Sequence, residues 1–328
     1  MRVFRGTAVP GCGKTNAAFG PFTAGKLIVP AAKTILFILL GFFAAVFCAV
    51  WSYDLARSRK WAWPTGYQSA VGFVTDFLDT LGVGSFAVTT TLYRLRKTVP
   101  DEQIPGTLNV GHCLPTITQA FIYISIIEVE MRTLVLTILA SVLGAWLGAG
   151  VVTRWPRRKI QLGMGFALLA AAGLILGRLV NLLPPGGDAL GLEGTYLAAA
   201  LVGNFAFGAL MMIGVGAYAP IMIMVSLLGM NPTTAFPIMM GSCAFLMPVA
   251  SLRIIRAGTY NAPAALGLTL AGVPAVLLAA FIVKELPLDV VRWLVVAVVV
   301  YTALSMLRAA SAESRTTATA AEPVGPEA

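Results

Sequence analysis

Charged residues are scarce in this sequence. Only 11% of the residues are Asp, Glu, Lys or Arg, whereas 58% are hydrophobic and the mean hydropathy is +0.85. This composition excludes a water-soluble globular chain. Several apolar stretches reach the roughly 18 to 20 residues that span a bilayer as a helix. We therefore expect an all-α, polytopic integral membrane protein that sits in the lipid bilayer.

The residues of common metal and redox sites are also few. The chain has one histidine, His112, and four cysteines whose spacing is neither zinc-like nor redox-like. It contains no His-Glu-x-x-His pattern and no nucleophile motif. We expect no metal, no cofactor and no disulfide framework, and we do not expect an enzyme.

Acidic residues are missing from the start of the chain. Residues 1–30 form a basic tail that we expect to be disordered, as we do residues 311–328. A P-loop pattern at residues 8–15 is interpreted as a chance match, because too few residues precede it for a β-strand. The net charge of +9 predicts no nucleic-acid partner, because Lys and Arg cluster in short loops as topology signals.

Two glycine-rich breaks interrupt long apolar segments. One reads Gly82-Val83-Gly84-Ser85 and the other, 132 residues later, Gly214-Val215-Gly216-Ala217. Glycine pairs weaken a helix and permit a sharp chain reversal. Irregular backbone survives at membrane depth only where protein or a water-filled cavity satisfies its polar groups, so both breaks are predicted binding sites.

The length of the first broken segment predicts a re-entrant hairpin. As one helix, residues 67–95 would reach about 44 Å, too long for an untilted crossing, while each half of roughly 21 Å is too short to span. We predict a transmembrane domain over residues 31–310. It contains an extra span at 31–53, a first repeat at 67–183 and a second repeat at 197–307. Each repeat has one hairpin and three spanning helices, among them the spans at 104–124 and 290–307.

A second landmark supports the repeat. Gly111-His112-Cys113 follows the first break, and Gly241-Ser242-Cys243 follows the second at a spacing that differs by two residues. Three crossings after each hairpin predict that the repeats are inverted. On this topology one face carries fourteen Lys and Arg residues and the other four, apart from the N-terminal tail. The richer face is predicted to be cytoplasmic.

The second break and its surroundings resemble a known family. The break continues as Gly216-Ala217-Tyr218-Ala219-Pro220 and is followed by the turn Leu228-Gly229-Met230-Asn231-Pro232. With the paired breaks, these motifs resemble the sulfite exporter TauE/SafE family, or 4-toluene sulfonate uptake permease family, over roughly residues 67–307. The first break lacks the family's proline. The resemblance implies a secondary transporter in the bacterial inner membrane that carries sulfite, organosulfonates or related small sulfur oxyanions, often as an exporter.

The helix after each break would present free amides and a positive dipole end to an anion. The sequence adds donors at equivalent positions, His112 and Ser242, and two asparagines. The alternative is that the glycines only let helices pack closely. The predicted substrate-binding residues are Gly82, Gly84, Ser85, Phe86, Asn109, His112, Asn204, Gly214, Gly216, Ala217, Tyr218 and Ser242.

Ionisable residues at membrane depth predict proton coupling. Asp76 and Asp79 are three residues apart on one helix face, and His112 lies in the following span. Intramembrane acids usually line a path or relay protons. Other hypotheses stay open: gating, capping or structural hydrogen bonding by these residues, a cation/proton exchanger using Asp76 and Asp79, or a membrane-embedded enzyme using His112. Gly144/Gly148 and Gly173/Gly177 predict helix packing or a homodimer contact.

Overall fold

The computed structural model describes residues 24–57, 62–152, 154–182, 186–214 and 216–282, and eight single residues between 293 and 311. This part of the chain forms α-helices and two short 3-10 helices, with no β-structure except one isolated bridge between Ala189 and Met230. The all-α prediction is confirmed. The P-loop pattern and the tail after residue 311 lie outside the described residues, and so does most of the predicted span at 290–307.

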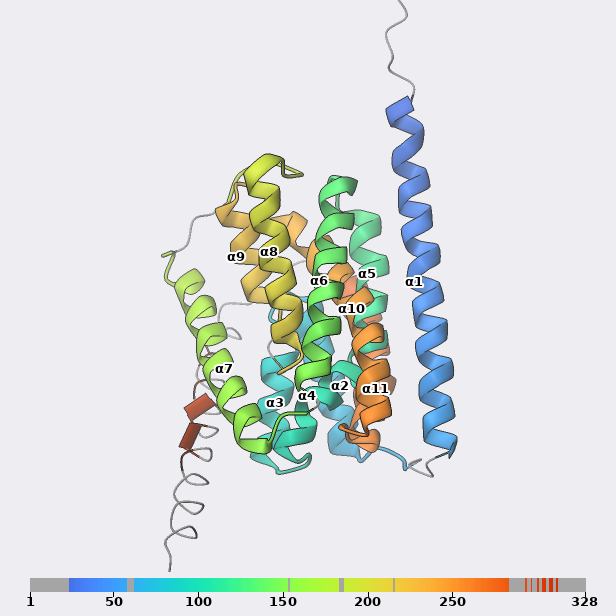
Figure 1. Ribbon diagram of the computed structural model, residues 1–328, viewed down its shortest axis with the longest axis vertical. Coiled ribbons are helices and arrows are strands. Elements are labelled where there is room, and N and C mark those ends of the chain that lie inside the picture. Colours follow the sequence, from blue (N-terminus) through green and yellow to red (C-terminus); the bar gives the residue numbers. More distant parts are fainter. Residues whose placement is uncertain are drawn as a thin grey trace, which may run out of the picture.

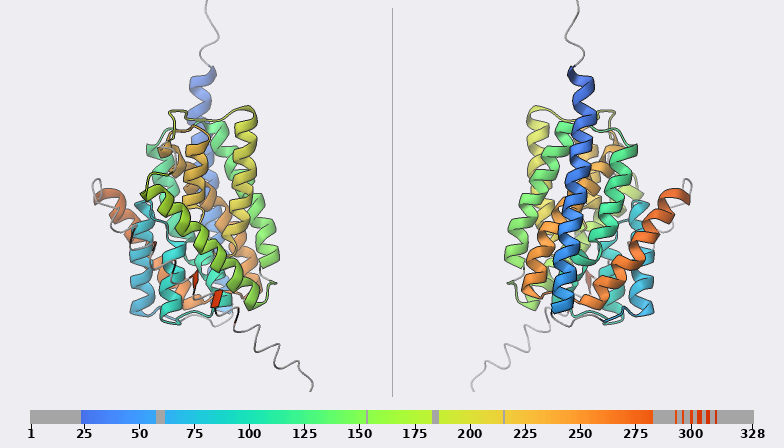
Figure 2. Two further views of the ribbon diagram at one scale, coloured as in Figure 1. Left: turned by 90° about the vertical axis from the view of Figure 1, so that its left-hand side faces the viewer. Right: turned by 90° about the vertical axis from the view of Figure 1, so that its right-hand side faces the viewer.

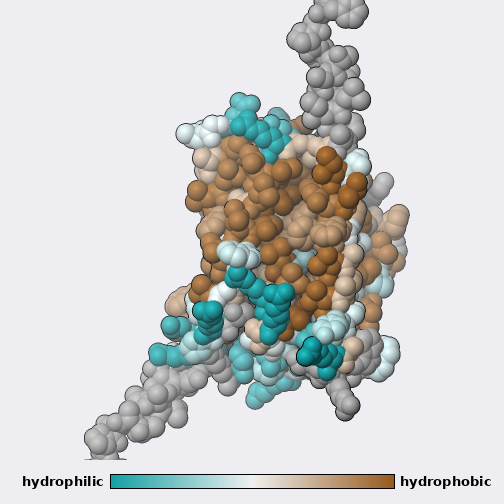
Figure 3. Space-filling model, turned by 45° about the vertical axis from the view of Figure 1, so that its right-hand side comes forward, coloured by the Kyte–Doolittle hydropathy of each residue, from teal (hydrophilic) through white to brown (hydrophobic). Residues whose placement is uncertain are grey.

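The helices suit a multi-pass membrane protein. Five of the described helices are long and apolar enough to cross a bilayer. Figure 3 shows a broad hydrophobic surface with hydrophilic residues at its two ends. The five helices are α1 (Ala24–Arg57), α6 (Met131–Val152), α8 (Gly194–Met211), α10 (Ala235–Ala257) and α11 (Ala262–Ile282).

Helix α1 stands at the outside of the bundle, as the two side views show (Figure 2). It contains the predicted extra span at 31–53 and packs on α10 and α5, with the Phe43 and Phe245 ring centroids 5.5 Å apart. At its C-terminal end the Tyr260 hydroxyl donates a hydrogen bond to Asp54 over 2.8 Å. Helix α1 is therefore tied to the bundle, although much of its apolar surface is exposed.

The first break separates α2 (Gly66–Thr80) from α3 (Phe86–Leu95), which lie together in the lower part of the bundle (Figure 1). A capping box starts α2, because the Thr65 and Gln68 side chains each accept the other's backbone N–H. The chain then reverses at Gly82 and Gly84, whose φ values of 84° and 92° favour glycine.

The second break separates α8 from α9 (Tyr218–Leu227), which lie in the upper part of the bundle (Figure 1). Here the chain turns at Gly214, with φ 83°. Helices α2, α3 and α9 have 15, 10 and 10 residues, too few to cross a bilayer. Helix α8 has 18 and is long enough by itself, so the two broken pairs differ in the length of their first helix.

A 3-10 turn follows each broken pair, η1 (Asp101–Gln103) after α3 and η2 (Pro232–Thr234) after α9. In the second half η2 leads into α10. In the first half the predicted single span at 104–124 is two helices, α4 (Ile104–Gly111) and α5 (Cys113–Ile126). The cause is Pro115, which has no N–H for the Gly111 carbonyl. The Thr269 hydroxyl donates to that carbonyl instead, over 2.6 Å.

The first helix of each broken pair packs on a helix of the other half, α2 on α11 and α8 on α6. Glycines allow both contacts. A Cβ on Gly72 would lie 2.6 Å from the Leu268 Cα, and Gly144 and Gly208 leave equally little room between α6 and α8. Gly144 therefore serves helix packing within the chain. Gly173 on α7 (Arg157–Leu179) has open space around it, and a homodimer contact there stays a prediction.

Candidate functional site

The two breaks meet at one small cavity. Ser85 and Phe86 from the first break line it, and so do Gly216 and Ala217 from the second, although 130 residues of chain separate them. Its volume of about 30 Å³ holds one or two water molecules and no polyatomic anion. The complete lining is Asp79, Gly84, Ser85, Phe86, Thr116, Met211, Gly216, Ala217, Met239, Met240 and Cys243.

The Ser85 backbone N–H, which the sequence analysis assigns to a bound anion, is already hydrogen-bonded to the Asp79 carboxylate. The Ser85 backbone N–H donates to Asp79 Oδ1 over 2.8 Å, and Gln119 Nε2 donates to Asp79 Oδ2 over 3.1 Å. The two donors hold the Asp79 carboxyl group at the edge of the cavity. Any anion at the Ser85 amide would have to displace Asp79.

His112 links α2 to α3 inside the bundle. Its Nδ1 lies 2.8 Å from Asp76 Oδ1 and its Nε2 lies 3.1 Å from Thr89 Oγ1. The three side chains are fully buried. The ring also lies against Phe86, with centroids 5.7 Å apart. His112 does not line the cavity itself, but it contacts Phe86, which does.

Asp76 keeps one oxygen without a partner. Among the described residues no group hydrogen-bonds Asp76 Oδ2, which lies over Gly272 of α11 where a Cβ would collide with it. A buried carboxylate oxygen without a donor is costly. The contact with His112 is therefore the one hydrogen bond that the described residues make to the Asp76 carboxyl group.

The sequence interpretation missed Thr89 and Gln119, which contact His112 and Asp79. It also missed Thr80, whose hydroxyl accepts from Gln119 Nε2 over 3.0 Å, and Tyr123, whose hydroxyl donates to the Thr80 carbonyl. A signal existed for Gln119, an amide in an otherwise apolar span seven residues after His112. Thr89 gave no signal, because threonine is common in apolar helices.

Three other predicted residues lie away from the cavity lining. Asn109 Nδ2 donates to the Pro105 carbonyl over 2.9 Å and to the Met211 carbonyl over 3.3 Å, so it satisfies the C-terminal end of α8. Asn204 Nδ2 donates within its own helix, to the Ala200 carbonyl. The Ser242 hydroxyl is buried with no partner among the described residues.

The remaining predicted residues belong to the two turns. Gly82 and Gly214 set the reversals through their positive φ values, and Gly84 and Gly216 line the cavity. Tyr218 begins α9, and the placement of its side chain is not described. The Gly214 turn lies against α4, since a Cβ there would be 3.8 Å from the Pro105 Cα.

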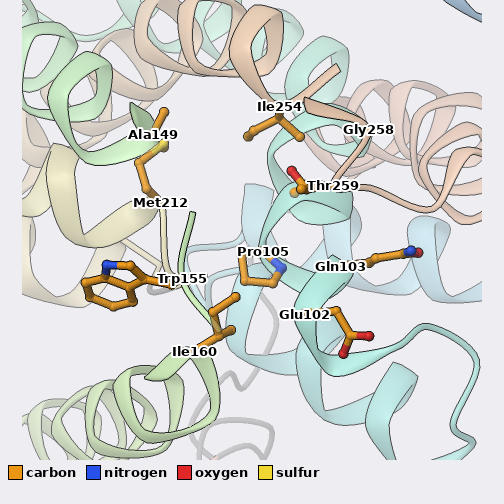
Figure 4. Close-up of a pocket in the computed structure, with 11 residues that line it drawn as sticks. Glu102, Gln103, Pro105, Ala149, Trp155, Ile160, Met212, Ile254, Gly258 and Thr259 are labelled. Carbon is orange, nitrogen blue, oxygen red and sulfur yellow. The ribbon is translucent and has the colours of Figure 1, made fainter. Parts of the chain in front are cut away.

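The two ends of the bundle differ in access. At the lower end a pocket of about 330 Å³ reaches Met212, beside the second break. Figure 4 shows Pro105 in the middle of its lining, with Trp155 and Met212 on one side and Gln103 and Glu102 on the other. At the upper end Tyr123 stacks on Phe236, with centroids 4.9 Å apart, and its hydroxyl binds the chain beside the first break.

Comparison with known proteins gives one match. Residues 13–175, about half of the chain, match the family model described as Sulfite exporter TauE/SafE. The matched segment holds the first break, Asp76, Asp79 and His112, whereas the motifs quoted for the resemblance lie mostly in the second half. No curated protein and no solved structure matches this chain.

Proposed function

We propose, on the premise that the chain belongs to the sulfite exporter TauE/SafE family, that it is a secondary transporter that exports small sulfur oxyanions such as sulfite or an organosulfonate. The family is one of membrane transporters, which favours this function over a membrane-embedded enzyme. The observation that carries the proposal is the cavity shared by the two breaks, where the Ser85 amide is held by Asp79.

We propose that the anion binds between the two breaks. Backbone amides at the start of α3 and α9, with the positive ends of both helix dipoles, replace the water around an oxyanion. The cavity of about 30 Å³ is too small for the cargo, so loading requires the two broken pairs to move apart. The pocket beneath Met212 and the Tyr123–Phe236 stack are then the two sides of an alternating path.

Proton coupling follows from the competition for the Ser85 amide. An ionised Asp79 accepts this N–H and excludes a second negative charge. When Asp79 takes up a proton, the carboxyl group becomes neutral and the amide can turn to the anion. Proton and anion would therefore move together, and Gln119 would hold Asp79 in place during the exchange.

We propose that the broken pairs are re-entrant hairpins of two inverted repeats. The exchanged packing of α2 on α11 and α8 on α6 supports this, because a two-fold relation between the halves would require it. The first pair lies at the lower end and the second at the upper end (Figure 1). With the basic face cytoplasmic in a bacterial inner membrane, the lower pocket opens to the cytoplasm.

The test is efflux of sulfite and of a small organosulfonate from proteoliposomes, with and without an imposed pH gradient. We expect gradient-dependent efflux from the wild type, and in Asp79→Asn a loss of about tenfold or more of the gradient-driven part. Asp188→Asn is the matched control, because Asp188 is exposed in the linker between the halves. Folded, inserted protein that moves no sulfur oxyanion would overturn the substrate class.

A cation/proton exchanger is the second candidate function, because the buried Asp76 Oδ2 has no partner among the described residues and could bind a cation. In that case the flux follows the cation across the same liposomes and is indifferent to sulfite. Asp79→Asn then stops cation flux without changing anion binding.

A further inference from the structure

Three consecutive threonines on α3 differ in their contacts. Thr89, Thr90 and Thr91 are all fully buried. Thr91 donates to the Ala87 carbonyl of its own helix over 2.8 Å, and the Thr90 hydroxyl has no partner among the described residues. Thr89 reaches across to His112 Nε2 at 3.1 Å. One hydroxyl of the three is therefore tied to an ionisable group.

The partners of His112 fix the direction of that hydrogen bond. A carboxylate only accepts, so the 2.8 Å contact with Asp76 Oδ1 places a hydrogen on His112 Nδ1. In the neutral imidazole Nε2 then carries a lone pair and accepts the Thr89 hydroxyl. A proton that arrives at Nε2 makes this nitrogen a donor, so the hydroxyl must turn and accept.

The displaced hydroxyl hydrogen has an acceptor one helical turn away. The Ser85 carbonyl lies four residues before Thr89 and accepts the Thr89 N–H over 2.9 Å. A carbonyl has a second lone pair, and threonine hydroxyls in helices commonly use it. Thr75, Thr80 and Thr107 make this four-residue hydrogen bond here. Turning Thr89 thus connects His112 to Ser85, whose amide binds Asp79.

We propose that Thr89 is a positioning residue that transmits the protonation of His112 to the backbone of the first break. When His112 is neutral, the hydroxyl points to the imidazole and the Ser85 carbonyl has the helix N–H alone. When His112 is charged, the hydroxyl points to Ser85 and adds a second hydrogen bond at the cavity. This proposal rests on the proposed proton-coupled transport.

Other titratable groups near His112 act on the same charge. Asp76 and Asp79 face it from α2, and the Tyr93 hydroxyl on α3 lies within the electrostatic reach of Asp76. From α10, the Cys243 thiol lies within the electrostatic reach of Asp79, and α11 faces Asp76 with Gly272. Of the described side chains, Thr89 is the one that hydrogen-bonds Nε2. Its removal therefore tests the transmission without removing a titratable group.

The test compares Thr89→Val with Thr90→Val and Thr91→Val in proteoliposomes. Valine keeps the shape and removes the hydroxyl. We expect Thr89→Val to lose about tenfold of the gradient-driven sulfite flux, while exchange of sulfite without a gradient stays within about twofold of the wild type. Thr89→Ser should restore the gradient response, and the two control variants should keep it.

A spectroscopic measurement covers the case in which Thr89→Val folds poorly. The chain has a single histidine, so ¹⁵N-histidine NMR of protein purified through a non-histidine tag reports on His112 alone. We expect the Nε2 resonance of the neutral ring to move in Thr89→Val and in Thr89→Ala, and to stay in Thr90→Val. An unmoved Nε2 resonance would overturn the contact.

The outcomes separate the two proposals. If the wild type shows no gradient-driven sulfur oxyanion flux, the proposed function fails. If the wild type shows it and Thr89→Val keeps the full gradient response, the transmission by Thr89 fails and the proposed function stands. Equal loss of the gradient response in Thr89→Val and Thr90→Val would also overturn the transmission by Thr89, because any change from threonine to valine on α3 would then have the same effect.

Discussion

The two broken pairs share a backbone and differ in chemistry. Each reverses at a glycine with φ near 84°, each is followed by a 3-10 turn, and each packs on a helix of the other half. Positions 132 residues apart nevertheless carry unlike side chains. The first-half residues Asp76, Asp79 and Thr89 correspond to Gly208, Met211 and Ile221.

This difference suggests a division of labour in which anion binding would use both halves and proton coupling would use the first half alone. Residues of both turns line the cavity, whereas Asp76, Asp79 and His112 all lie in the first half. A second pair of acids would add two more negative charges around one buried anion, and like charges at short range are strongly unfavourable. On the proposed function, the first half would exchange the proton while both halves hold the anion.

The largest expected effect compares Gln119→Leu with Met211→Leu. Gln119 supplies the side-chain donor to Asp79 Oδ2, and losing the partner of a buried charged group costs about 1–3 kcal/mol or more, roughly 5- to 150-fold in flux. Met211 also lines the cavity, but Met and Leu have similar volumes and the exchange costs under about 1.5 kcal/mol. Gradient-driven efflux of both variants measures the difference.

If Met211→Leu loses as much gradient-driven efflux as Gln119→Leu, the contrast between the halves is wrong, because the second half would then also take part in coupling. Equal amounts of folded protein, measured by size-exclusion chromatography in detergent, make the fluxes comparable.

The next effect tests what the two halves share. Gly82→Ala and Gly214→Ala each force an L-residue into the left-handed region, with φ 84° and 83°. The cost is about 1–2 kcal/mol per position, or a few degrees in apparent melting temperature. We expect similar shifts from the two variants in a thermal melt of the detergent-purified protein, with Gly41→Ala as the control in open space. A shift in one variant alone would show that only one break keeps this backbone.

The smallest effects concern the two asparagines. Asn109 caps the Met211 carbonyl from another helix, whereas Asn204 bonds only its own helix; Oδ1 of each has no partner among the described residues. We expect Asn109→Ala to lower stability by about 1–2 kcal/mol and Asn204→Leu to be neutral or slightly stabilising. If Asn204→Leu loses transport but keeps the melting temperature of the wild type, Asn204 takes part in substrate binding after all.

The sequence was enough to predict the helical class, both breaks and the acids beside the first. These features follow from local signals: apolar length, glycine pairs and charges at membrane depth. It could not predict that Asp79 itself holds the Ser85 amide, because this depends on the turn geometry between them. Nor could it pair Thr89 with His112, since that contact requires the relative rotation of two helices.

The exchanged packing of α2 on α11 has a consequence for the making of the protein. Residues 81–261 separate the two helices, so a ribosome that works from the N-terminus finishes the first broken pair long before α11 exists. During that interval no Gly272 covers the Asp76 carboxyl, and the pair stands beside lipid with its acids unshielded. A chain that stops before residue 262 therefore lacks the helix that covers Asp76, and the packing of α2 is completed only when α11 has been made.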